Sequence, residues 1–246
     1  MRAHGSVLGL WVRRTLPLTL LVTAATAAVQ VGTFLYAMEQ DAAAVPVAFW
    51  NMELLMDQTR MEVQFVLGLL LVGLAAVRPA LQRGKWRYTL RRLRVREEAS
   101  ILWYAAAAFG CFLLYWGSET AVCLGLTALA AARSDPGFVS GQTAFLLSQG
   151  IPLFQSLLPV TSALAYVRNI LMFLTLALFA AMGCRGRTWV SAYTAALILC
   201  AWQFVTDIDR VTGDIVDSMA AAVCLLAAGA VLAEGWKGGG DEAEDL

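Results

Sequence analysis

The sequence RPALQRGKWRYTLRRLRVREE, from Arg78 to Glu98, contains eight of the eighteen Lys and Arg residues of the chain. Long apolar runs lie on both sides of it. Because basic loops of membrane proteins stay on the cytoplasmic side, this stretch predicts the orientation of every neighbouring segment. It is also the largest polar surface that the chain offers to a partner.

The composition around this stretch is that of a membrane protein. The 246 residues are 59% hydrophobic and 15% charged, whereas a soluble domain is nearer half apolar and a quarter charged. We therefore expect an all-α, polytopic membrane protein. Residues 1–236 are predicted to form one transmembrane domain, with a cytoplasmic loop at 78–99 and an outer segment at 134–160, followed by an acidic flexible tail at 237–246.

Six apolar runs are predicted to cross the membrane. The third is the longest, and at 1.5 Å per residue it exceeds the ~30 Å hydrocarbon core, so it must tilt, protrude or break near Gly117-Ser118. The outer segment at 134–160 is interrupted by Gly and Pro and predicts one or two short helices. The six runs lie at about residues 16–38, 63–77, 101–132, 161–182, 188–206 and 215–233.

Residues 1–15 mix arginines with large apolar side chains. This pattern fits either a short helix on the inner membrane surface or an ordinary positively charged flank. Thr15 could cap the first span, and Pro17 is tolerable in a first helical turn. Ala25-Thr26-Ala27 resembles a signal-peptide cleavage site, but the apolar run continues past it, so we expect an uncleaved span.

The distribution of charge predicts the topology. With the N-terminus inside, the inner segments hold fourteen Lys and Arg residues and the outer segments hold three. This bias predicts six spans with both termini in the cytoplasm, in the cell membrane of a bacterium.

Motifs for catalysis are missing from the sequence. There is no G-x-x-x-x-G-K-[ST], H-E-x-x-H or G-x-S-x-G motif, and the single His is His4. The five cysteines form no C-x-x-C pair. The acidic loop at 207–214 does not fit the spacing of an EF-hand and is expected to be a solvated outer loop. We therefore expect no enzyme activity, no cofactor and no metal.

Glu119 and Arg168 are the charged residues that we place within spans, in the third and fourth. Intramembrane charges are costly and are candidates for function. Both are expected in the outer half of the membrane. One hypothesis is that they face each other as an ion pair or a hydrogen-bonded pair. The alternative is that each side chain extends independently to the outer surface.

The basic stretch has the spacing of an amphipathic helix, with an apolar face and a basic face. It could serve only to set the topology, it could bind anionic lipid at ~1 kcal/mol per basic residue, or it could dock a cytoplasmic protein. The apolar face comprises Trp86, Leu90 and Leu93, and the basic face comprises Arg87, Arg91 and Arg94.

This layout resembles the permease subunits of ABC-2-type transporters, and the run from Trp86 to Leu93 is similar to uncharacterised bacterial membrane proteins of that kind. The resemblance implies an exporter of lipids, peptides or drugs that forms a homodimer or heterodimer. It also implies that the loop between spans two and three is a coupling helix for a separate ATP-binding subunit.

The chain departs from that family in its short loop at 207–214, because the family commonly has outer helices between spans five and six. The alternative function is a non-transporting membrane scaffold or regulatory protein that binds a partner or anionic lipid through the basic loop. A lipid-modifying membrane enzyme is disfavoured, and no nucleic-acid partner is expected.

Overall fold

The computed structural model describes residues 2–42, 52–81, 97–133, 151–159, 162–205 and 210–237. These residues form eight α-helices and no strand, so the predicted all-α class is confirmed for the described part. The helices are α1 (Arg2–Ala42), α2 (Met52–Gln58), α3 (Met61–Leu81), α5 (Glu97–Arg133), α7 (Pro152–Leu157), α8 (Ala163–Met182), α9 (Arg187–Val205) and α10 (Arg210–Lys237).

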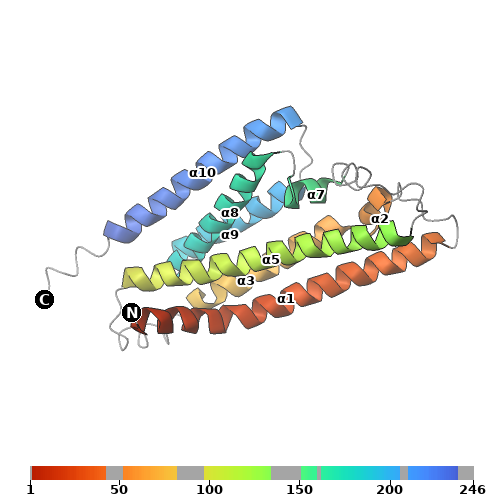
Figure 1. Cartoon of the computed structure of the whole chain (residues 1–246). Helices are drawn as coiled ribbons and strands as arrows, with labels where there is room; N and C mark the ends of the chain where they lie inside the picture. Colours follow the sequence, from red (N-terminus) through yellow and green to blue (C-terminus); the bar gives the residue numbers. More distant parts are fainter. Residues whose placement is uncertain are drawn as a thin grey trace, which may run out of the picture.

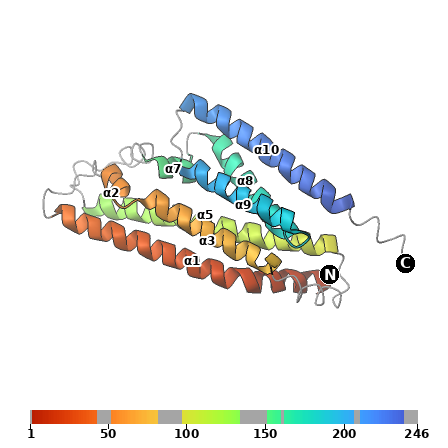
Figure 2. The same ribbon diagram turned by 180° about the vertical axis from the view of Figure 1, so that it is seen from behind.

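The long helices pack side by side and alternate in direction (Figure 1). Helices α1, α3 and α5 pack together, α8 and α9 lie against α3, and α8 also contacts α5. Helix α10 packs mainly on α8, at the edge of the bundle, as the view from behind also shows (Figure 2). The beginning of α1 and the end of α10 lie at the same end of the bundle.

In the described part of the chain, five helices are long and apolar enough to cross a membrane: α1, α3, α5, α8 and α10. The chain is therefore a multi-pass membrane protein. The predicted fifth span is also a helix, α9, but it is not among these five. Six spans with cytoplasmic termini remain a prediction.

Of the two alternatives for residues 1–15, the structure does not show a separate surface helix. Helix α1 is continuous from Arg2 to Ala42, with Pro17 inside it. The hydroxyl of Thr15 donates to the Trp11 carbonyl at 3.0 Å within the helix and does not cap a helix start. Trp11 is 1% exposed and its ring stacks on Tyr104 of α5 at 4.3 Å. The apolar side chains of the arm thus pack on a neighbouring helix.

Helix α5 does not break near Gly117-Ser118. Its 37 residues correspond to about 55 Å, so the helix must tilt or protrude beyond a ~30 Å core. Helix α3 also continues past the end of the second predicted span at about residue 77, through the Arg78-Pro79 pair to Leu81. Proline in a last turn costs a single intrahelical hydrogen bond, which explains this tolerance.

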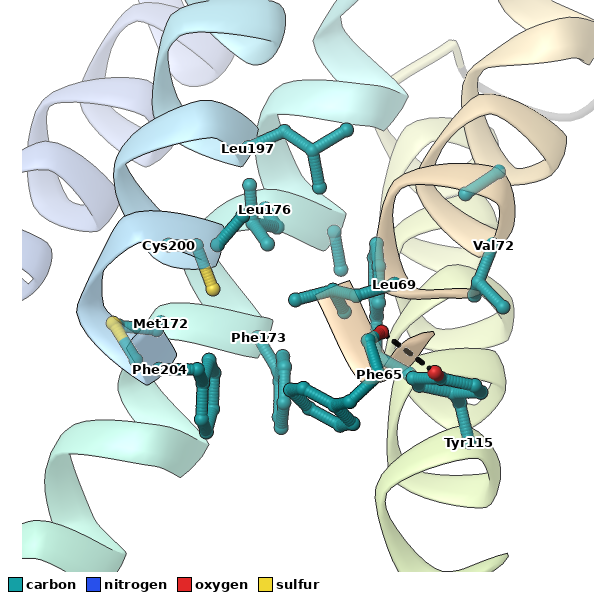
Figure 3. Close-up of a cluster of buried hydrophobic side chains, with 14 of the residues drawn as sticks. Phe65, Leu69, Val72, Tyr115, Met172, Phe173, Leu176, Leu197, Cys200 and Phe204 are labelled. Atoms are coloured by element: carbon teal, nitrogen blue, oxygen red, sulfur yellow. Dashed lines mark hydrogen bonds between the residues drawn. The ribbon is translucent and has the colours of Figure 1, made fainter. Parts of the chain in front are cut away.

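An aromatic cluster joins four of the helices (Figure 3). Phe65 of α3 packs against Tyr115 of α5 at 5.6 Å and Phe204 of α9 at 5.0 Å between ring centroids. Phe173 of α8 contacts Phe204 at 6.2 Å and Phe112 of α5 at 5.8 Å. Rings at these separations stabilise a helix interface beyond the area they bury.

Candidate functional site

The coupling helix predicted from the basic stretch lies in residues 82–96, outside the described residues. Its flanking helices are described: α3 ends at Leu81 and α5 begins at Glu97. Both of these helix ends lie at the end of the bundle where α1 begins (Figure 1). The assignment of Trp86, Leu90 and Leu93 to a docking face therefore remains a prediction.

The hypothesis that Glu119 and Arg168 form a pair is wrong. Glu119 accepts a hydrogen bond from Gln30 of α1, and Arg168 forms an ion pair with Asp217 of α10. The reason is the position of α8, which packs between α5 and α10. Glu119 points from α5 toward α1, whereas Arg168 points from α8 toward α10. The alternative, extension to the outer surface, is equally wrong for both, because Glu119 is 0% and Arg168 is 6% exposed.

The first buried polar site joins α1 to α5 through Glu119 and Gln30. Both residues are 0% exposed, and Gln30 Nε2 donates to Glu119 Oε2 at 2.7 Å. Tyr115 lies one turn earlier on α5, and its hydroxyl donates to the Phe65 carbonyl at 2.8 Å. A carboxyl group at such a position is costly to bury in a membrane and is a functional candidate for that reason.

A row of small polar side chains on α1 leads to this site. The buried members Thr15, Thr19, Thr23 and Gln30 recur at intervals that place them on one face of the helix. Thr15 and Thr19 satisfy their hydroxyls by donating to the carbonyl four residues earlier, a common solution within membrane helices. The interface of α1 therefore carries a polar row among apolar side chains.

The second buried polar site joins α8 to α10 and to α7. Arg168 Nη1 donates to Asp217 Oδ1, and its Nε and Nη2 donate to Asn169 Oδ1 at 3.1 and 2.9 Å. Asn169 Nδ2 in turn donates to the Ser156 carbonyl at 2.8 Å. Arg168 is thus neutralised by a fixed partner and has several donors satisfied. This arrangement indicates a structural clamp.

Two members of these sites were missed in the sequence. Asp217 is not among the candidates from the sequence, although it lies within the sixth predicted span and is a natural partner for an intramembrane arginine. Gln30 was not singled out, although it is the last buried member of a polar row with helical spacing that begins at Thr15. Both signals were available in the sequence.

Gly68 of α3 provides the space for the site between α1 and α5. A methyl group there would overlap the Tyr115 hydroxyl and approach Thr26 Oγ1 to 2.8 Å. We expect Gly68→Ala to lower the free energy of unfolding by about 1–3 kcal/mol, because the site cannot expand without moving packed helices. Chemical or thermal unfolding of the purified protein in detergent measures this loss.

Gly117→Ala is the matched control for that substitution. Gly117 also lies inside a long helix, but no heavy atom lies within 4 Å of the position of an added Cβ. Alanine should be neutral or stabilising there, because it has the higher helix propensity. Equal losses for the two variants would mean that the close approach at Gly68 does not determine the packing.

No protein-family model, curated protein or solved structure matches this chain. Within the ranges that the structure describes, no group of three His, Cys, Asp or Glu side chains could hold a metal ion. The candidate site is therefore assigned from its own side chains: the buried pair of Glu119 and Gln30, with Tyr115 and the α1 polar row beside it.

Proposed function

We propose that this chain is the membrane-embedded permease subunit of a transporter driven by a separate ATP-binding subunit, with export as its direction. The observation that carries the proposal is the buried Glu119 with its amide partner Gln30 between two membrane helices. An apolar pair of the same size would join α1 and α5 without the cost of burying a carboxyl group. Polar groups kept within membrane helices at this cost commonly mark transport sites.

The position of the basic loop in the chain supports the part of the proposal that assigns a separate ATP-binding subunit. Residues 82–96 connect the end of α3 to the beginning of α5, two helices that pack on α1 and on each other. A protein that pushes on this loop would therefore act directly on α5, which holds Glu119, and on α3. Both helices pack on α1, which holds Gln30. We propose that this end of the bundle faces the cytoplasm, where ATP is available.

The same loop also favours the second candidate function, a scaffold that binds a partner or anionic lipid without transport. Its seven basic residues would hold such a surface at the membrane by charge alone. The two functions differ in the partner that they require. A P-loop ATPase bound in a fixed ratio supports a permease, whereas lipid binding alone supports a scaffold.

The test is co-purification of the tagged full chain, expressed with its neighbouring genes, with a P-loop ATPase. We expect the double substitution Leu90→Asp and Leu93→Asp to weaken this association by at least about a hundredfold, because each Leu contributes roughly 1.5–3 kcal/mol when buried. The measurement is the amount of ATPase retained, together with its ATP hydrolysis in liposomes.

The control is the double substitution Tyr88→Asp and Val95→Asp. It adds the same charge to the same loop but, at 100° per residue, on the opposite face of the predicted helix. It should leave the association intact. If wild type purifies without an ATPase, or if both double variants bind equally, the coupling function is wrong.

A further inference from the structure

If Glu119 is ionised, the buried pair of Glu119 and Gln30 has two acceptor oxygens that receive no hydrogen bond. Gln30 Nε2 donates to Glu119 Oε2 at 2.7 Å. The second oxygen of each group, Glu119 Oε1 and Gln30 Oε1, is buried and has no hydrogen-bond donor among the described residues. Two unsatisfied acceptors, one on each side of an existing hydrogen bond, are costly away from water.

One proton removes both defects. A carboxylic acid can donate through one oxygen and accept through the other, and a carboxamide can do the same. The two groups then form a reciprocal pair: Gln30 Nε2 donates to Glu119 Oε2, and a proton on Glu119 Oε1 is donated to Gln30 Oε1. We propose that Glu119 and Gln30 form a proton-binding site between α1 and α5, with Glu119 held as the neutral acid.

The groups around Glu119 agree with a neutral acid. Helix α1 presents Gln30 and Thr26, which do not ionise, and α3 presents the backbone at Phe65 and Gly68. The ionisable neighbours lie on α5 itself, namely Tyr115 and Cys123. Neither is a cation that could stabilise a carboxylate.

Arg168 is a buried cation that could in principle pair with Glu119. It is bound instead to Asp217, on the far side of α8. That ion pair already neutralises Arg168. Among the described residues, no cation faces Glu119 to compensate a carboxylate charge. An ionised carboxylate without one would be far more costly than the acid in the same place.

Tyr115 is the rival donor, because it lies one turn from Glu119 on the same helix. Its hydroxyl has a single proton, and the Phe65 carbonyl accepts it at 2.8 Å. The same hydroxyl also lies within hydrogen-bonding reach of the Glu119 carboxyl, so its proton can serve Phe65 or Glu119 but not both. Removal of this hydroxyl distinguishes the two explanations, since a proton bound by Glu119 would remain when Tyr115 is replaced.

The proposal is independent of any ATP-binding partner. A proton site can exist in a permease, where it couples proton movement to transport, or in a scaffold, where it responds to pH. Failure of the co-purification test would leave the proton site standing, and the absence of a bound proton would leave the coupling function standing.

Infrared spectroscopy of the purified full chain in lipid nanodiscs, at neutral pH, tests the proposal. Wild type should show the C=O stretch of a protonated carboxylic acid, and Glu119→Gln should lose it while remaining folded. The band should persist in Tyr115→Phe. It should move to higher frequency in Gln30→Met, because the acid then donates no hydrogen bond to the amide oxygen.

Three results would overturn the proposal. The first is a spectrum of wild type without an acid band, which means that Glu119 is a carboxylate. The second is a band that disappears in Tyr115→Phe, which assigns the proton to the tyrosine. The third is a carboxylate signal that changes with added Na⁺ at constant pH, which assigns the site to a metal cation.

Discussion

Replacing Asp217 by Ala is expected to lower the free energy of unfolding by about 3–5 kcal/mol. The substitution leaves the guanidinium of Arg168 buried, at 6% exposure, without its counter-ion. Arginine cannot shed its charge to escape this cost. Because α10 packs mainly on α8, the loss should also loosen α10. Denaturation in detergent, followed by circular dichroism, measures the change.

Two control variants separate the charge from other effects. Ser218→Ala changes the exposed neighbour of Asp217 and should leave stability within about 0.5 kcal/mol of wild type. The double variant Arg168→Met with Asp217→Ala removes both charges and should recover most of the loss, since apolar replacements of buried ion pairs are often neutral. A double variant as unstable as Asp217→Ala alone would show that the ion pair does not explain the effect.

The long helices were predictable, because five of them in the described part of the chain contain an apolar run that is long enough to cross a bilayer. Their contacts were much less predictable. In a soluble helix the apolar face identifies the core, but lipid is as apolar as Leu, so buried and lipid-facing sides look alike. Helix α8 illustrates the difficulty: Phe173 is buried and Ile170 is 41% exposed, although both are large apolar residues.

The predicted pairing of Arg168 with Glu119 was wrong for this reason. The sequence identifies Arg168 and Glu119 as buried charges but contains no apolar periodicity to show which side of its helix each one occupies. Polar spacing carries that information instead. The row from Thr15 to Gln30 marks the side of α1 that faces its neighbours, and it could have indicated that Glu119 has a partner on α1.

The N-terminal arm shows a second ambiguity. The mixture of arginines and large apolar residues at 1–15 fitted a helix on the membrane surface as well as an ordinary charged flank. In the structure, Val7 is 0% and Trp11 is 1% exposed, because they extend the interface of α1 with α5. The same amphipathic pattern suits a membrane surface and a second helix, and only the position of α5 decides between them.

The substitution of Phe173 by Ala tests the aromatic cluster, and we expect a loss of about 3 kcal/mol in the free energy of unfolding. Phe173 is 0% exposed and its ring contacts Phe112, Trp116 and Phe204, with centroids 5.8, 6.0 and 6.2 Å away. Phe→Ala costs about 3–5 kcal/mol in cores. The lower end applies here, because the Phe173 ring of the wild-type protein enters lipid and not water when the helices separate. Its burial therefore contributes packing but little hydrophobic free energy.

Ile170→Ala provides the control on the same helix. Its side chain is 41% exposed to the surroundings of the bundle, so its removal leaves no cavity and should cost less than about 1 kcal/mol. Phe173→Leu should fall between the two, since leucine refills part of the volume. Because Phe173 connects α5, α8 and α9, its loss should reduce the cooperativity of unfolding as well as its midpoint. Equal effects at positions 170 and 173 would mean that the cluster does not hold these helices together.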